Sequence, residues 1–173
     1  MTAIAAIHPE QMQRQHARDS SQWPELWALL DQVKDPEIPV LSIWDLGVLR
    51  DVAVNDQDQL VVNITPTYSG CPAMKQIEQD IKDCLESAGH ADVVVNSLLS
   101  PAWSTDWMTA QGRAQLKEYG IAPPEASNTR RAVACPQCQS ADVQVISEFG
   151  STACKALYKC NDCLEPFDYF KCI

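Results

Sequence analysis

Residues 135–163 read CPQCQSADVQVISEFGSTACKALYKCNDC, and the cysteine pairs at the two ends of this stretch decide the fold of the C-terminal part of the chain. Each pair is a CxxC motif, and 21 residues lie between the two motifs. One CxxC turn presents two sulfurs to a metal ion, so two such turns supply the four thiolates of a tetrahedral zinc site. We therefore predict one metal site, with zinc as the expected ion, held by Cys135, Cys138, Cys160 and Cys163.

The segment between the two motifs supports this interpretation. The interval is slightly longer than the usual ~15–20 residues, but residues 143–146 and 157–158 carry apolar side chains that suit the two arms of a β-hairpin. The module would span residues 132–173, too few for a sufficient core, so the metal contributes much of its folding free energy. A redox-active CxxC normally opens a helix in an α/β setting, and neither motif does. An iron–sulfur cluster is the other group that four thiolates hold.

Two further cysteines lie in the same module. Cys154 precedes Cys160 by six residues, and Cys172 is the penultimate residue. Such cysteines often act as small buried apolar side chains or as free surface thiols. The alternative is that they form a second ligand set or help to hold an iron–sulfur cluster. Spacing does not decide between these interpretations.

The composition of the whole chain excludes several functions. Its 173 residues carry a formal net charge of −10, which argues against binding to nucleic-acid phosphates. No stretch approaches the ~18 uncharged apolar residues of a membrane span. Residues 1–21 lack the features of a signal peptide and read as a flexible tail. Because thiols cluster for metal or redox chemistry in a reducing cytosol, we expect a cytoplasmic protein with no membrane or nucleic-acid partner.

Residues 22–121 have the length and apolar periodicity of one α+β domain. The pattern predicts helices over 24–33 and 72–88, a hairpin of strands over 48–54 and 60–65, a third strand over 92–99, and a short helix ending near Tyr119. Trp44, Trp103 and Trp107 are expected to cover the core or a partner surface. Residues 122–131, APPEASNTRR, have the composition of a linker.

Two residues of this domain are candidates for chemistry. Cys71, in SGCP, immediately precedes a predicted helix, where unpaired backbone N–H groups and the helix dipole favour a thiolate that could bind metal or a cluster. Glu37 lies between two prolines in DPEIP, so its backbone is stiff and its direction is fixed. Each also has a plain structural interpretation, as a cysteine in an apolar niche and as a solvated loop acid. Cys84, in the apolar stripe of the same helix, is expected to be a core residue.

Four stretches together carry a family resemblance: DPEIPVLSIWDLGVLRDV (35–52), TPTYSGCP (65–72), PAWSTDWM (101–108) and ISEFGSTACKALYKCNDCLEPFDYFKCI (146–173). They resemble the MIP18 (DUF59) family of iron–sulfur assembly proteins. Within it, they are most similar to the D subunits of bacterial phenylacetyl-CoA epoxidase systems, in which a zinc ribbon follows the same domain. The resemblance covers about residues 22–173 and is specific because several motifs occur in combination.

The resemblance implies a small α+β domain, with helices packed on a three-stranded sheet, followed by a zinc ribbon. It implies an accessory function in iron–sulfur cluster assembly for the oxygenase of phenylacetate catabolism, rather than an enzyme activity of the chain itself. Glu37 and Cys71 fall on the positions that would handle iron or a transient iron–sulfur cluster. The implied partners are the [2Fe–2S] reductase subunit and the other oxygenase subunits.

Two other functions stay open. The chain could be an electron-transfer or structural subunit of the oxygenase, with its own metal or iron–sulfur centre at the four ribbon cysteines. It could also be an assembly scaffold in which Cys71 has no chemical role. Nor does the sequence decide whether the chain forms a homo-oligomer.

Overall fold

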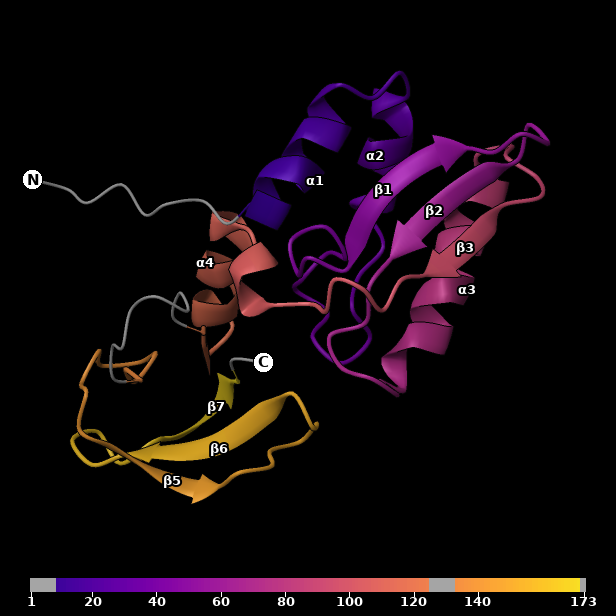
Figure 1. The fold of residues 1–173 in the computed structure, drawn as a ribbon. Coiled ribbons are helices and arrows are strands. Elements are labelled where there is room, and N and C mark those ends of the chain that lie inside the picture. Colours follow the sequence, from indigo (N-terminus) through magenta and orange to yellow (C-terminus); the bar gives the residue numbers. More distant parts are fainter. Residues whose placement is uncertain (1–8, 125–132, 172–173) are drawn as a thin grey trace, which may run out of the picture.

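The computed structural model describes residues 9–124 and 133–171, which form two β-sheets with four α-helices (Figure 1). The predicted α+β class with a C-terminal zinc ribbon is confirmed. In chain order the elements are α1 (Pro9–Asp19), α2 (Pro24–Leu30), β1 (Leu49–Val54), β2 (Leu60–Ile64), α3 (Ala73–Ser87), β3 (Val94–Ser97), the 3-10 helix η1 (Thr105–Trp107), α4 (Ala110–Glu118), β4 (Ile121–Ala122), β5 (Val143–Ser147), β6 (Lys155–Cys160) and β7 (Pro166–Phe170).

The first sheet has the strand order β1-β2-β3. Strands β1 and β2 form the predicted antiparallel hairpin, whereas β3 runs parallel to β2. Parallel neighbours need a crossover connection, and α3 supplies it while covering one face of the sheet (Figure 1). The predicted helices and strands of this domain are confirmed, with ends shifted by one to three residues.

Helix α3 positions the candidate site and packs by the apolar stripe that its sequence predicts. Met74, Ile77, Ile81 and Leu85 are buried in the core of the first domain. Cys84 is only half-buried at the edge of that core, where its thiol donates to the carbonyl of Leu29 at 3.4 Å. The expectation that Cys84 is a core residue therefore holds only in part.

The three tryptophans belong to the core. Trp44, Trp103 and Trp107 are at most 8% exposed, so the core interpretation is confirmed over the partner surface. The indole N–H of Trp103 donates to the carbonyl of Leu46 at 3.1 Å, which fixes the aromatic loop against residues 42–46.

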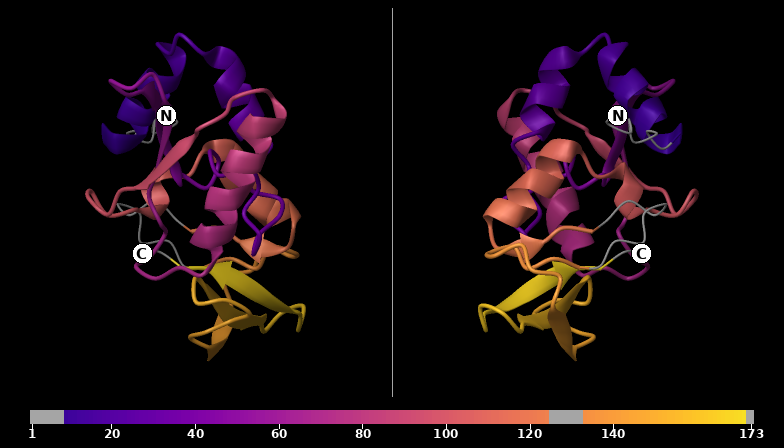
Figure 2. Two further views of the ribbon diagram at one scale, coloured as in Figure 1. Left: turned by 90° about the vertical axis from the view of Figure 1, so that its right-hand side faces the viewer. Right: turned by 90° about the vertical axis from the view of Figure 1, so that its left-hand side faces the viewer.

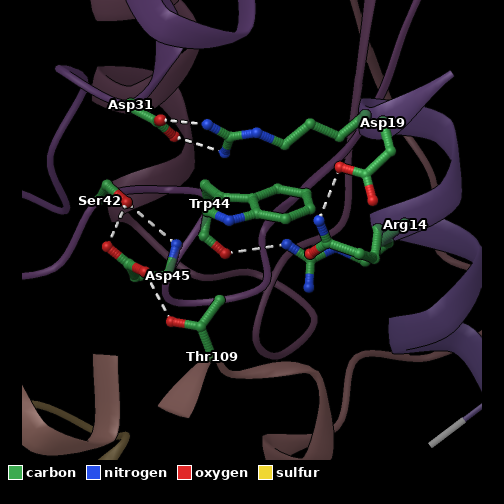
Figure 3. A network of polar contacts seen from close by, with 9 residues as sticks. Arg14, Asp19, Asp31, Ser42, Trp44, Asp45 and Thr109 are labelled. Carbon is green, nitrogen blue, oxygen red and sulfur yellow. Dashed lines mark hydrogen bonds and ion pairs between the residues drawn. The ribbon is translucent and has the colours of Figure 1, made fainter. Parts of the chain in front are cut away.

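The prediction of a flexible tail over residues 1–21 is wrong for residues 9–19, which form helix α1 on the N-terminal domain. The buried guanidinium of Arg14 donates to the backbone carbonyls of Leu49, Trp107 and Trp44 at 2.8, 2.7 and 2.8 Å. Figure 3 shows this side chain beside the ring of Trp44. The Cζ atom of Arg14 lies 4.4 Å from the centroid of that ring. A single buried cation, rather than an apolar stripe, holds the helix in place.

A second polar network lies beside this one and ties the loop after residue 41 to α4 (Figure 3). The carboxylate of Asp45 accepts from the hydroxyls of Ser42 at 2.8 Å and Thr109 at 2.6 Å. Thr109 is also the N-cap of α4, because its hydroxyl accepts from the backbone N–H of Gly112.

The second sheet has the order β4-β7-β6-β5 and includes the predicted hairpin of β5 and β6. It docks directly on the N-terminal domain. Cys154 and Phe170 belong to the core cluster of that domain, and the ring of Phe170 packs edge-on against Trp103 at 6.1 Å. The prediction of a linker over residues 122–131 is wrong at Ala122, which lies in strand β4. Residues 125–131 of the predicted linker lie outside the described residues.

Within residues 9–124 and 133–171, no helix is both long enough and apolar enough to cross a membrane.

Candidate functional site

The two CxxC motifs come together as predicted. The four sulfurs of Cys135, Cys138, Cys160 and Cys163 all lie within 4.8 Å of one another. The sulfur atoms of Cys135 and Cys163 are 3.7 Å apart, and those of Cys138 and Cys160 are 3.5 Å apart. Four sulfurs at about 2.3 Å from one ion at the centre of a tetrahedron are about 3.8 Å apart, so this set fits one tetrahedral ion.

Both motifs adopt the same backbone turn. The N–H of Cys135 donates to the carbonyl of Ser140 at 2.8 Å, and the N–H of Cys160 donates to that of Glu165 at 3.0 Å. In each turn the fourth residue after the first cysteine is in the left-handed region, with φ values of 66° at Gln139 and 67° at Leu164. Two equivalent turns therefore present their sulfurs to a common centre.

Backbone donors favour the thiolate form of one of the four cysteines, Cys160. The N–H groups of Cys163 and Asp162 lower the pKa of Cys160 to about 7 against the effect of burial. Hydrogen bonds of this kind stabilise a thiolate, which is the form that binds a metal ion.

A second group of polar side chains lies where the ribbon meets the N-terminal domain. The first member of this group is Glu37, whose backbone is held by the side chain of Asp35. One carboxylate oxygen of buried Asp35 accepts from the backbone N–H groups of Glu37 and Ile38, both at 2.8 Å. The N–H of Asp35 in turn donates to the carbonyl of Leu41 at 2.9 Å, so the DPEIP loop is a closed turn. Glu37 itself is half-exposed.

Cys71 lies in the loop that leads into α3, as the sequence predicts. Pro72 is the N-cap of the helix, and the N–H of Met74 donates to the carbonyl of Cys71 at 3.3 Å. The thiol is only partly buried, against the edge of the core. Cys71 is therefore not sealed in apolar packing.

Tyr68 links Cys71 to Glu37. Burial raises the pKa of the Tyr68 hydroxyl to about 12, and the charge and hydrogen bonding of Cys71 and the charges of Glu37 and Cys154 add to this effect. Four polar groups from three separate segments of the chain thus lie around one position. Of the two extra thiols, Cys154 joins this group, and Cys172 lies outside the described residues.

Asp35 and Tyr68 are the members of this site that the sequence analysis missed. An aspartate that directly precedes Pro-Glu is a known turn former, because its side chain accepts from backbone N–H groups two and three residues later. That signal could have identified Asp35. No comparable local signal exists for Tyr68, whose role depends on contacts between distant segments.

We expect Asp35→Asn to stabilise the protein at neutral pH. Burial raises the pKa of Asp35, against the two N–H donors and the charge of Lys155. A raised pKa means that full stability is present below the unfolded-state pKa and is lost as the pH rises through the folded-state pKa. Asparagine keeps the oxygen acceptor and carries no charge. In urea unfolding, its advantage over the wild type should therefore grow as the pH rises from the ordinary carboxyl pKa of about 4 towards neutrality.

Asp35→Ala is the matched control, because it removes the acceptor as well as the charge. Relative to Asp35→Asn, it should be less stable by about 2 kcal/mol across this pH range, since two backbone N–H groups lose their partner. If the stability of Asp35→Asn relative to the wild type instead falls as the pH rises, the attraction of Lys155 for the Asp35 carboxylate outweighs the cost of burying its charge. A carboxylate that costs stability and is nevertheless present suggests a function for its charge beside Glu37.

Comparison with known proteins agrees with the two domains. Residues 24–96 match the family model "Iron-sulfur cluster assembly protein", and residues 121–171 match "PaaD zinc beta ribbon domain". The chain is 50% identical, over the full length of both proteins, to the putative D subunit of the 1,2-phenylacetyl-CoA epoxidase of Escherichia coli K12. It is 34% identical to a "Fe-S protein maturation auxiliary factor" of Porphyromonas gingivalis, covering 51% of this chain and 84% of the relative.

A crystal structure of a DUF59 domain from Bacillus anthracis is also similar, with 29% identity and a TM-score of 0.49 over 61% of this chain and 95% of that one. The full-length match carries the assignment, because it includes both domains in the same order. The chain therefore belongs to the family of phenylacetyl-CoA epoxidase D subunits, with an iron–sulfur cluster assembly (DUF59/MIP18) domain followed by a zinc ribbon.

Proposed function

We propose that this protein is an accessory maturation factor that delivers iron or an iron–sulfur cluster to a phenylacetyl-CoA epoxidase system. The observation that carries this proposal is the placement of Cys71. Its thiol is partly exposed at the start of α3, in one polar site with Glu37 and Tyr68, within the domain that matches the assembly family.

The chemistry of this site suits cargo that arrives and leaves. Thiolates and carboxylates are both ligands for iron. A thiol that is open to solvent on one side can exchange its bound metal with a ligand of another protein, as the transfer of a cluster requires. The ribbon site differs because it is a complete ligand set: its four sulfurs already face one another, although Cys138 is exposed. We infer that the ribbon holds zinc permanently and that Cys71 handles the cargo.

The name of the full-length relative supports an oxygenase as the client. Within such a system, we propose the [2Fe–2S] reductase subunit as the recipient, because a protein that carries cluster cargo needs a partner that accepts a cluster. The epoxidation would then be the work of the other oxygenase subunits, and this chain would have no catalytic residue of its own.

Cys71→Ser tests the proposed function. Co-expressed with the reductase subunit, the variant should lower the occupancy of the client's [2Fe–2S] centre about tenfold, because the sulfur that holds the cargo is lost. Client iron, sulfide and visible absorption are measured per reductase chain. The far-UV circular dichroism of the variant should match the wild type, because the thiol is partly exposed at the edge of the core.

Cys84→Ser is the matched control: it makes the same atomic change at a partly buried thiol within α3, whose hydrogen bond goes to Leu29. It should leave the cluster content of the client unchanged. Full occupancy of the client with Cys71→Ser would overturn the proposed function and favour a scaffold without thiol chemistry.

A further inference from the structure

Among the described cysteines of the ribbon, Cys154 is the one that faces the N-terminal domain. It directly precedes β6 and is 5% exposed, within the core cluster of the first domain rather than that of the ribbon. Its backbone is fixed on both sides: its carbonyl accepts from the N–H of Lys171 at 2.9 Å, and the N–H of Lys155 donates to the carbonyl of Thr152 at 3.1 Å. The thiol therefore has one defined position in the docked protein.

The immediate neighbours of this thiol are polar. The sulfur of Cys154 donates toward Oε2 of Glu37 at 3.9 Å and shares a hydrogen bond with the Thr152 hydroxyl at 3.0 Å. A cysteine that only fills space in a core is surrounded by apolar atoms. Glu37 and Thr152 therefore bring a carboxylate and a hydroxyl to the sulfur, and both offer lone pairs to a metal cation. The neighbouring cation, Lys155, pairs with Asp168 at 3.6 Å.

Cys71 approaches the same place from the other domain. The hydroxyl of Tyr68 is hydrogen-bonded to Cys71 and lies within electrostatic range of Glu37 and Cys154. In Figure 1 and Figure 2 the ribbon sheet lies at the lower end of the N-terminal domain, the end at which α3 begins. Two thiols and a carboxylate from residues 37, 71 and 154 therefore converge at the junction of the domains.

We propose that Cys154 is a third ligand for the iron–sulfur cargo, so that the ribbon completes the Cys71–Glu37 site. This inference rests on the proposed function and extends it, because it makes the cargo site depend on both domains. On binding, the Cys154 thiol gives up its proton to solvent by way of Glu37, and its sulfur replaces one external ligand of an iron atom. No electron is transferred and no bond within the cargo breaks.

The spacing of the ligands favours a cluster over a single ion. Among the described residues, the ribbon cysteines are the only group of three or more metal-binding side chains whose ligand atoms all lie within 4.8 Å of one another. The junction residues are therefore more widely spaced than a single ion requires. A cluster with more than one iron spans a larger distance between its protein ligands, and it suits this more open set.

The test uses full-length, zinc-loaded protein reconstituted with ferrous iron and sulfide without oxygen. Zinc is measured before and after, so that a cluster inserted in the ribbon site would be detected as lost zinc. Bound iron, bound sulfide and visible charge-transfer absorption are then followed after an iron chelator is added. We expect the cluster of Cys154→Ser to be lost about tenfold faster than that of the wild type, and that of Cys84→Ser at the wild-type rate.

Because Cys154 is buried, the docking of the ribbon is measured in the same samples. Cys154→Ala is included as an apolar replacement. The docking of the ribbon is followed by amide hydrogen exchange in β6 and β7 and by the tryptophan fluorescence, to which Trp103 contributes through its contact with Phe170 across the junction. Faster loss of the cluster in both variants with unchanged fluorescence and zinc supports the ligand role. Loss of the cluster only in variants that also lose docking would overturn it.

The outcome separates this inference from the proposed function. A cluster that is retained by Cys154→Ser but lost by Cys71→Ser overturns the ligand role of Cys154 and leaves Cys71 as the cargo residue. A wild-type protein that binds no iron and sulfide beyond its zinc site overturns both.

Discussion

Removing the ion from the ribbon is expected to unfold residues 133–171 while the N-terminal domain stays folded. The ribbon's own core cluster is small and consists of Ala122, Cys135, Cys160 and Phe167. Two of these four residues are themselves proposed ligands, so little apolar packing remains without the ion. Structural zinc sites contribute about 10–16 kcal/mol of apparent binding free energy, far more than such a core supplies. The N-terminal domain has its own extended core and does not share this dependence.

Chelation of the zinc-loaded protein, or Cys138→Ser, is the experiment. We expect amide exchange in β6 and β7 to become fast and the summed tryptophan fluorescence to shift to longer wavelength, because the contact of Trp103 with Phe170 is lost. Zinc content is measured in parallel, and Cys84→Ser should keep both the zinc and the slow exchange. Slow exchange in β6 and β7 of the metal-free protein would show instead that docking on the first domain holds the ribbon.

Local patterns explain which parts of the ribbon could be predicted. Each CxxC motif spans only four residues, and the hairpin joins two strands, β5 and β6, that follow one another in the sequence. Strand β7 was not predicted, although it forms the centre of the sheet together with β6. The two residues of β4 were assigned to the end of the first domain and to a linker, because a strand this short has no periodicity. It exists only because β7 offers it a parallel edge.

The same distinction applies to the candidate site. Glu37 and Cys71 stood out because each lies in a short motif with its own physical meaning: a turn between prolines and a helix start. The position of Cys154 could not be predicted, since residues 37 and 154 are separated by 117 positions and meet only when the ribbon docks. Spacing along the chain carries no information about such a contact. The two interpretations of Cys154 therefore stayed open until the fold was known.

The largest difference between prediction and structure is helix α1, which lies where the sequence predicts a flexible tail. The helix is polar along most of its length, so its composition resembles that of a solvated tail. What orders it is one arginine whose three carbonyl partners lie at residues 44, 49 and 107. Burial lowers the pKa of Arg14 to about 9, with a further contribution from Arg50, and the side chain remains charged at neutral pH. A buried cation is rarely the anchor of a helix, and it has no signature in a single sequence.

We expect Arg14→Met to lower the unfolding free energy by about 3 kcal/mol. Three backbone carbonyls lose a charge-assisted hydrogen bond, each worth about 1.5–3 kcal/mol, and relief from burying the charge offsets part of this loss. Methionine keeps the apolar length of the side chain, so the loss reports on the hydrogen bonds rather than on a cavity. For a protein of this size, the expected fall in Tm is about 10 °C. Thermal and urea unfolding of the zinc-loaded protein measure it.

Arg18→Met is the matched control, because it makes the same change one turn later on α1. Arg18 forms an ion pair with Asp31 and lies over the same Trp44 ring at 4.7 Å, but its side chain is 25% exposed. Exposed ion pairs contribute up to about 1 kcal/mol, so this variant should change Tm by no more than about 3 °C. Arg14→Lys keeps the charge but presents a compact ammonium in place of the planar fork, and it should lie between the other two. If Arg14→Met and Arg18→Met cost the same, α1 is held by its surface contacts, and the buried guanidinium is not its anchor.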